Sequence, residues 1–231
     1  MLTYAIRHAQ SRFNTGHDPG LDSDLTDLGR RQVEALARRF SGAPVAAVYS
    51  SPFKRCLQTA IPVARALGLA VRIRPELCEF HNLPTGAPPP IELPDIAALV
   101  SAHPGVMPDP DFAEPVRWPR LDESRSDMIA RMRLFAGHLK TRWIGMDDTV
   151  LVFSHGSPIA RLVDAWVSEA PGPSFRFIID NATVNALRFA GGIASLICLN
   201  EASHLQGLEP PAQANLDTRG LIKPQAPSSY W

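Results

Sequence analysis

Short apolar runs with strand character alternate with amphipathic helical segments along most of this 231-residue chain. The strand-like runs are "LTYAI" at 2–6, "VAAVYSS" at 45–51, "AVRIRP" at 70–75 and "DTVLVFS" at 148–154. Strand–helix units of this kind build a parallel sheet with helices packed on both of its faces. The alternation therefore predicts an α/β fold, a three-layer α/β/α sandwich with a mostly parallel central sheet.

The helical segments carry recognisable start and stop signals. In "LTDLGRRQVEALARRF", Thr26 is a suitable N-cap residue and the apolar side chains recur at helical spacing. The segment "PFKRCLQTAIPVARALGL" contains Pro62, which predicts a kink or a break. A further helix is expected over "DESRSDMIARMRLFAGHLKTRW", and "ATVNALRFAGGIASLICLN" predicts a hairpin that turns at Gly191 and Gly192.

Two segments depart from this alternation. Ten of the 22 prolines fall between Pro84 and Pro119, so residues 80–120 are unsuited to central strands and are expected to form a Pro-rich cap insertion over the core. Residues 207–231 are rich in Pro, Gln and Ser and predict a poorly ordered or surface-draped tail. We therefore expect one α/β domain over residues 1–206, cap included, followed by the tail.

Composition excludes several classes of protein. Lys and Arg together number 23 and so do Asp and Glu, which gives no support to a nucleic-acid or membrane-surface partner. The sequence contains no uninterrupted run of eighteen apolar residues, so it predicts no membrane-spanning helix. Cys56, Cys78 and Cys198 form no CxxC pair and predict buried or free thiols in a reducing compartment. A soluble cytoplasmic protein is expected, and this composition also allows a homodimer.

Two of the strand-like runs end in a histidine, "YAIRH" at His8 and "VLVFSH" at His155. Ligands of parallel sheets bind at the carboxyl ends of the strands, so both imidazoles are expected in one crevice. Arg7 adjoins the first histidine, and Arg55 follows a third strand on the first turn of the next helix. Two arginines and two histidines around one point predict a site for a dianion such as phosphate.

Four motifs resemble one known family. "RHAQS" followed by Asn14, then "LTDLGRRQ", "YSSPFKRCLQTA" and "VFSHG", in that order, are similar to the histidine phosphatase superfamily, the phosphoglycerate-mutase-like fold. The similarity covers roughly residues 2–70 and 149–205, and "LNEASHL" resembles a C-terminal segment of the family. Ala9 stands where the family often has Gly.

The resemblance implies a catalytic role for each matched residue. His8 would be the nucleophile that attacks phosphorus and forms a phosphohistidine. The phosphoryl oxygens would be held by Arg7, Arg55, His155, Asn14 and Gly156. No metal and no cofactor are required, because the positive side chains and the backbone donors at the helix starts neutralise the phosphate.

The family also places an acidic proton donor after the third strand, in a segment like "ELCEFHN". Glu79 aligns best with that position, and Glu76 is the alternative. His81 follows closely and is interpreted as a surface residue. The continuation "FHNLPTGAPPP" departs from the family's Gly-rich pattern, which leaves the substrate open.

The expected function is hydrolysis of a small phosphorylated substrate. No long ordered insertion of the kind that closes over the phosphohistidine in cofactor-dependent mutases is visible, so hydrolysis is favoured over phosphoglycerate mutase-type transfer between hydroxyls. The mutase reaction remains the alternative.

Three other functions compete with this prediction. "DSDLT" at 22–26 matches the D-x-D-x-T pattern of magnesium-dependent aspartyl phosphatases, but a loop-like segment precedes it. "VFSHG" half matches a serine-hydrolase nucleophile elbow around Ser154, with Asp180 and His204 following in order. A phosphate-binding module without turnover is the third.

Overall fold

A mixed sheet forms the centre of the computed structural model, which describes residues 1–16, 22–81, 95–111, 123–143, 145–168 and 177–208. Within these residues the sheet has seven strands in the order β4-β3-β2-β5-β1-β6-β7. The strands are β1 (Leu2–Arg7), β2 (Val45–Ser50), β3 (Val71–Ile73), β4 (Val106–Pro108), β5 (Thr149–Ser154), β6 (Val184–Ala190) and β7 (Ile193–Glu201). The helices are α1 (Asp27–Phe40), α2 (Lys54–Ala66), α3 (Ile96–Ala102), α4 (Arg125–Arg142) and α5 (Gly156–Val167), with single 3₁₀ turns η1 (Phe13–Thr15), η2 (Pro75–Leu77) and η3 (Ser203–Leu205).

The sheet is mostly parallel, which confirms the prediction from sequence. Strands β4, β3, β2, β5 and β1 run parallel to one another, and only β6 pairs antiparallel, with β1 on one side and β7 on the other. The hairpin between β6 and β7 turns at Gly191 and Gly192, as expected. Both glycines have positive φ, 57° and 79°, a conformation that glycine adopts at no steric cost.

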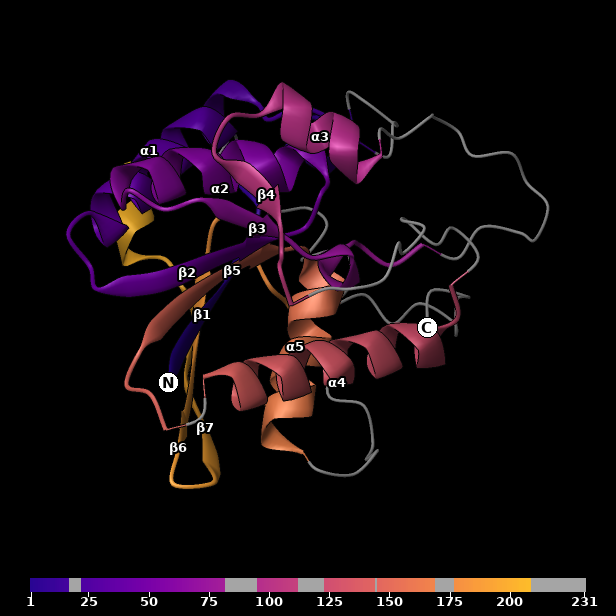
Figure 1. Cartoon of the computed structure of the whole chain (residues 1–231). Helices are drawn as coiled ribbons and strands as arrows, with labels where there is room; N and C mark the ends of the chain where they lie inside the picture. Colours follow the sequence, from indigo (N-terminus) through magenta and orange to yellow (C-terminus); the bar gives the residue numbers. More distant parts are fainter. Residues whose placement is uncertain (17–21, 82–94, 112–122, 144, 169–176, 209–231) are drawn as a thin grey trace, which may run out of the picture.

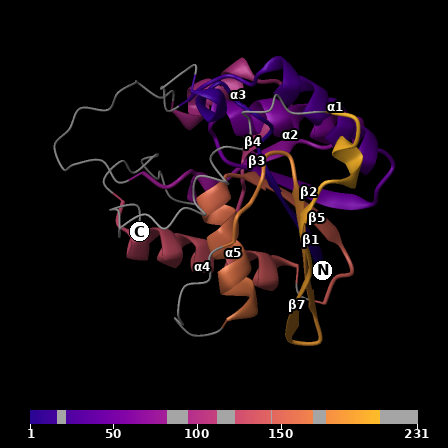
Figure 2. The same cartoon turned by 180° about the vertical axis from the view of Figure 1, so that it is seen from behind.

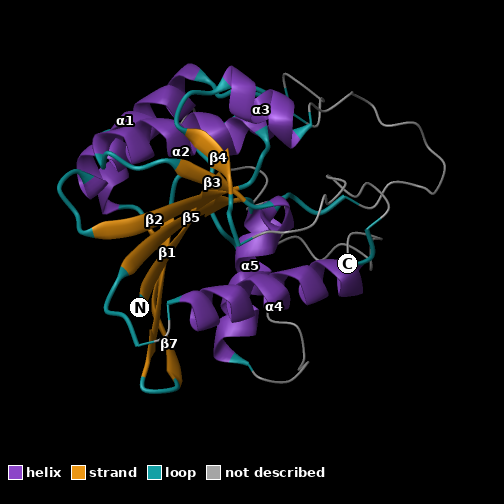
Figure 3. Cartoon of the chain, in the orientation of Figure 1, coloured by secondary structure: helices purple, strands orange, loops and turns teal. Residues whose placement is uncertain are grey.

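Helices cover both faces of the sheet (Figures 1 and 3). α1, α2 and α3 lie on one face and α4 and α5 on the other, and the view from behind shows the same separation (Figure 2). Successive residues of β5 enter different cores, because side chains alternate across a strand. Val150 and Val152 join the core under α4 and α5, whereas Leu151 and Phe153 join the core under α1 and α2.

The strand register brings the ends of three central strands together. Arg7 at the end of β1 pairs with Ser154 at the end of β5, and Ser50 at the end of β2 pairs with Phe153. The backbone N–H of His8 continues this pairing by donating to the Ser154 carbonyl at 2.9 Å. The residues that follow these strands therefore meet at one edge of the sheet, where parallel sheets bind ligands.

Local signals explain the helix boundaries. The Thr26 hydroxyl accepts a hydrogen bond from the Gly29 N–H and caps α1, as its sequence predicts. Ser124 and Asp127 form a capping box at the start of α4. The sequence predicts a kink or a break at Pro62, and the break is wrong because α2 continues to Ala66. Pro62 lies on the exposed face of α2, where the missing N–H removes a single hydrogen bond of the helix.

The described part of the Pro-rich region contributes to the sheet. Residues 95–111 form α3 and the edge strand β4, which pairs with β3. The predicted cap falls mainly on residues 82–94 and 112–122, and the predicted tail on residues 209–231, all outside the described residues. Among the helices of the described part, none combines the length and the apolar character needed to cross a bilayer. All three cysteines are free.

Candidate active site

His8 directly follows β1, and the whole residue is only 2% exposed. Its Nδ1 is 2.8 Å from the carbonyl oxygen of Ala9. A carbonyl only accepts hydrogen bonds, so this contact assigns the ring proton to Nδ1. The lone pair is thereby left on Nε2, and that nitrogen is available as a nucleophile or as a base.

The two arginines surround this imidazole. Arg55, the second residue of α2, lies with its guanidinium over the ring of Phe53 at 4.6 Å and donates from Nε to Nε2 of His8 at 3.2 Å. Arg7 donates from Nη1 to the carbonyl of Ile179 at 2.6 Å. Gly156 lies against Arg7, because a Cβ on Gly156 would be 3.8 Å from Cζ of the arginine.

His155 occupies the N-cap position of α5 without a capping hydrogen bond from its side chain, and it is completely buried. Its ring meets the ring of His8 edge-on, with 5.1 Å between the centroids. Nε2 of His155 lies 3.0 Å from the hydroxyl of Ser51 and 3.4 Å from the thiol sulfur of Cys56. Residues that follow β1, β2 and β5 thus converge on one point, with the starts of α2 and α5 beside it.

Burial and charge act in the same direction on both histidines. Burial lowers the pKa of His8 well below its ordinary value of 6.5, and the charges of Arg55 and Arg7 lower it further. For His155, burial again lowers the pKa most, followed by the charge of Arg55. Both imidazoles are therefore neutral near pH 7, and a neutral His8 retains the lone pair that nucleophilic attack requires.

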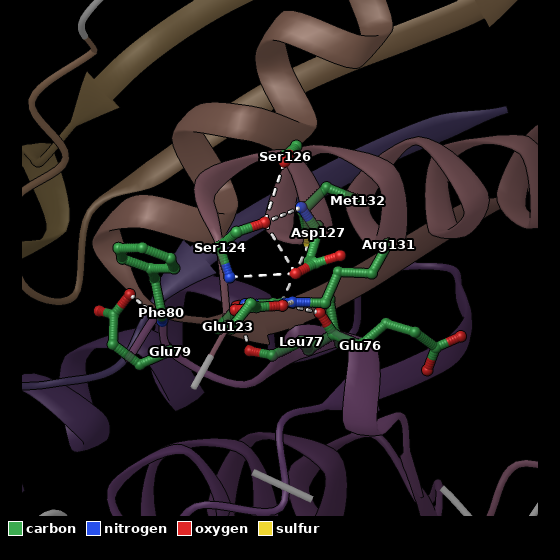
Figure 4. Close-up of polar contacts among 11 residues, drawn as sticks. Glu76, Leu77, Glu79, Phe80, Glu123, Ser124, Ser126, Asp127, Arg131 and Met132 are labelled. Atoms are coloured by element: carbon green, nitrogen blue, oxygen red, sulfur yellow. Dashed lines mark hydrogen bonds and ion pairs between the residues drawn. The ribbon is translucent and has the colours of Figure 1, made fainter. Parts of the chain in front are cut away.

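The structure separates the two candidate acids (Figure 4). Glu76 forms an ion pair with Arg74 at 2.7 Å, and its carboxylate points away from that of Glu79. Glu79 is half-buried and accepts a hydrogen bond from the N–H of Phe80 at 2.9 Å. Among the described residues Glu79 forms no ion pair, whereas Glu76 is paired with Arg74.

His81 belongs to the surroundings of the site, so its interpretation as a surface residue is wrong. Its ring packs against Phe53 with 5.7 Å between centroids. Burial lowers the pKa of His81, the charge of Glu79 raises it, and the charge of Arg55 lowers it. His81 is therefore partly buried against Phe53, within the electrostatic reach of Glu79 and Arg55, a position that its place on a polar loop does not reveal.

Asn14 has a visible structural role. Its Oδ1 accepts hydrogen bonds from the N–H and hydroxyl of Ser11 and from Nδ2 of Asn181. Asn181 also donates to the carbonyl of His8 at 3.0 Å. The N–H of Ala182, which has a φ of 57°, lies within 3.2 Å of the carbonyls of Arg7 and His8. The turn at Asn181 and Ala182 therefore holds the backbone of Arg7 and His8 in place.

The sequence did not single out Ser51, Asn181 or Ala182, which lie around the two histidines. Ser51 lies inside the motif "YSSPFKRCLQTA" and directly follows β2, so the rule that strand ends meet at one edge could have predicted its place. Asn181 and Ala182 directly precede β6, which is antiparallel, and no strand-end rule pointed to them.

The geometry argues against two of the competing functions. The hydroxyl of Ser154 donates to the carbonyl of Leu77 at 2.7 Å and is fully buried. His204 lies 3.0 Å from the carbonyl of Ala182 and 3.3 Å from Arg39, so it serves no triad with Ser154. Asp22 follows no described strand and accepts from the Lys54 N–H at the start of α2.

Comparison with known proteins identifies the family. The model of the histidine phosphatase superfamily (branch 1) matches residues 3–202. The chain belongs to this superfamily. It is 28% identical to "Phosphoserine phosphatase 1" of Hydrogenobacter thermophilus over 209 residues, 87% of this chain and 92% of that relative. It is 30% identical to "Glucosyl-3-phosphoglycerate phosphatase" of Mycobacterium tuberculosis over 171 residues, 68% of this chain and 71% of that one.

Solved structures agree with this assignment. A mycobacterial glucosyl-3-phosphoglycerate phosphatase in complex with VO3 superposes with a TM-score of 0.63 at 25% identity, covering 87% of this chain and 99% of that one. A phosphoserine phosphatase mutant from Entamoeba histolytica in complex with phosphoserine has a TM-score of 0.62 at 20% identity, with 88% and 98% covered, and shows the shared fold. These two relatives and these two solved proteins are all phosphatases.

Proposed function

We propose that this histidine phosphatase hydrolyses phosphomonoesters without a metal, through a phosphohistidine on Nε2 of His8. The hydrogen bond from Nδ1 to the Ala9 carbonyl carries this proposal, because it leaves Nε2 with the lone pair beside Arg55 and His155. The names of the relatives support a small phosphorylated metabolite as substrate, such as an alkyl phosphate.

In the first step, Nε2 of His8 attacks phosphorus and the bond from phosphorus to the ester oxygen breaks. Arg55, Arg7 and His155 hold the phosphoryl oxygens while their charge is redistributed. Glu79 gives a proton to the leaving oxygen, so an alcohol departs and a carboxylate remains.

In the second step, water attacks the phosphohistidine and the bond from phosphorus to nitrogen breaks. Glu79, now ionised, takes a proton from that water, so inorganic phosphate leaves and the acid is restored.

We place the protein in the cytoplasm, because three free cysteines suit a reducing compartment.

The decisive experiment measures phosphate release from an aryl phosphate in excess EDTA. We expect release by the wild type, and a loss on the order of 10³-fold or more in His8→Ala, since the nucleophile is removed. His103→Ala, at the end of α3 and outside the site, is the matched control and keeps full activity. Equal release by His8→Ala and the wild type would overturn the proposal.

The same preparation tests the intermediate. A quenched reaction should contain an acid-labile, base-stable phosphoprotein in the wild type and none in His8→Ala. Interconversion of phosphate positions on a sugar phosphate that outpaces phosphate release would instead indicate the mutase reaction.

A further inference from the structure

The segment 76–81, which carries Glu79, is held at both ends by two residues, Arg131 within α4 and Glu123 just before it; Figure 4 shows both beside Glu76. At one end, Nη1 of Arg131 donates to the carbonyl oxygen of Glu76. At the other end, the backbone N–H of Glu123 donates to the carbonyl oxygen of His81 at 3.1 Å. The two contacts attach the segment to α4 at points five residues apart in the sequence.

The pair that makes these contacts is itself rigid. Arg131 and Glu123 form two parallel hydrogen bonds, Nε to Oε1 at 2.5 Å and Nη2 to Oε2 at 2.8 Å. The side chains are 16% and 3% exposed, so water competes little for these groups. A bidentate pair fixes the guanidinium plane as well as its position. The capping box of Ser124 and Asp127 fixes the start of α4 next to it.

The side chain of Glu79 moves with this segment, because its Oε1 accepts from the N–H of Phe80. The same segment is also held from the sheet. The hydroxyl of Ser154, at the end of β5, donates to the carbonyl oxygen of Leu77 at 2.7 Å. The backbone of the segment that carries Glu79 is thus held from two sides, by the end of β5 and by Arg131 and Glu123.

We propose that Arg131 and Glu123 form a clamp that positions Glu79 for proton transfer, an inference that rests on the proposed function. The pair contacts the segment only through the backbone carbonyls of Glu76 and His81, so we assign both as positioning residues. Proton transfer requires hydrogen-bond distance, and a misplacement of about 1 Å costs on the order of 10²-fold in rate.

Glu123 contributes twice to these contacts, because its carboxylate fixes the guanidinium of Arg131 and its backbone N–H holds the carbonyl of His81. Glu123→Gln keeps the backbone contact but weakens the bidentate pair, so it is expected to loosen the clamp even where Arg131 stays in place.

The test compares two esters with Arg131→Met. An alkyl phosphate needs a proton on its leaving oxygen, whereas 2,4-dinitrophenyl phosphate does not. We expect kcat/KM for the alkyl ester to fall at least about tenfold and that for the activated ester less than about threefold. Arg131→Lys keeps one donor and should recover part of the loss. Arg142→Met, on the same helix in an exposed ion pair with Asp111, is the matched control and changes neither value.

Addition of Arg131→Met to Glu79→Gln separates positioning from general damage. If the clamp acts through Glu79, the double variant loses no more than about twofold beyond Glu79→Gln on the alkyl ester. Equal losses on both esters, or fully additive losses, would overturn the clamp while His8-dependent release by the wild type keeps the proposed function. Absence of His8-dependent release from either ester would overturn the proposed function and the clamp with it.

Discussion

The Nε of Arg55 lies 3.2 Å from Nε2 of His8, and both residues are almost fully buried. The guanidinium therefore contacts the very nitrogen that we propose as nucleophile. Its charge lowers the pKa of His8, after the larger effect of burial, and keeps the imidazole neutral. A phosphate that enters the site offers oxygens to the same N–H groups and frees the lone pair of Nε2 for attack.

This relationship predicts the pH dependence of the reaction. The acidic limb of kcat/KM reports the free enzyme, so for the wild type it should lie well below pH 6.5. Arg55→Met removes a charge that lowers the pKa of His8, so the limb should move upward toward 6.5, while kcat/KM falls on the order of 10²-fold.

Arg55→Lys is the control for that experiment. It retains the positive charge and loses the planar fork of donors, so kcat/KM should fall while the acidic limb stays near its wild-type position. An unchanged limb in Arg55→Met would show that Arg55 does not act on the pKa of His8.

The two glutamates of "ELCEFHN" should differ in kinetics. Glu79→Gln should reduce kcat for an alkyl phosphate by about 10²–10⁴-fold and for 2,4-dinitrophenyl phosphate much less, because only the alkoxide needs a proton. Glu76→Gln is the matched control, since Glu76 is paired with Arg74, and it should leave the ratio of the two rates unchanged. The opposite outcome would make Glu76 the acid.

Acid should destabilise the fold through the buried histidines. The unfolded chain binds protons below about pH 6.5, whereas folded His8 and His155 stay neutral because their pKa values are lowered. The unfolded state thus holds more protons in this range, and the free energy of unfolding falls as the pH drops below 6.5. The slope is at most about 1.4 kcal/mol per pH unit for each histidine.

Thermal unfolding between about pH 7.5 and about pH 5 would measure this effect, because this range brackets the free histidine pKa of about 6.5. His8→Asn removes one of the titrating groups, so its Tm should decline less steeply below pH 6.5 than that of the wild type. Parallel curves would contradict a neutral, buried His8.

A buried ion pair supports the sheet beside the site. Nη1 of Arg74 lies 2.8 Å from Oδ2 of Asp109, which is 1% exposed, and Arg74 also pairs with Glu76. Arg74→Met leaves a buried carboxylate without its cation and should lower the free energy of unfolding by about 3–5 kcal/mol.

Urea denaturation would measure this loss, with Arg142→Met as the control. Arg142 and Asp111 are both 40% exposed, so their ion pair should contribute at most about 1 kcal/mol. A second substitution, Asp109→Asn, should recover part of the loss of Arg74→Met by removing the unpaired charge. Similar losses in both single variants would show that burial does not decide the strength of these pairs.

Local sequence patterns predicted most of the architecture and the centre of the site. The alternation of apolar strands with amphipathic helices specifies the parallel sheet, since it leaves few other ways to bury the apolar faces. His8 and His155 follow directly from it, because each ends an apolar strand and such ends meet at one edge. The cap at Thr26 and the turn at Gly191 and Gly192 involve only residues close together in the chain, so the sequence alone predicts them.

Tertiary structure alone decided the remaining features, since each depends on segments far apart in the chain. Glu76 and Glu79 lie three residues apart and look alike in sequence, but Arg74 pairs with the first, while Arg131 and Glu123 hold the backbone of the segment that carries the second. The tautomer of His8, the burial of His81 and the continuity of α2 through Pro62 likewise follow from packing. Desolvation and the geometry of charged pairs set these outcomes, and both arise only when distant segments come into contact.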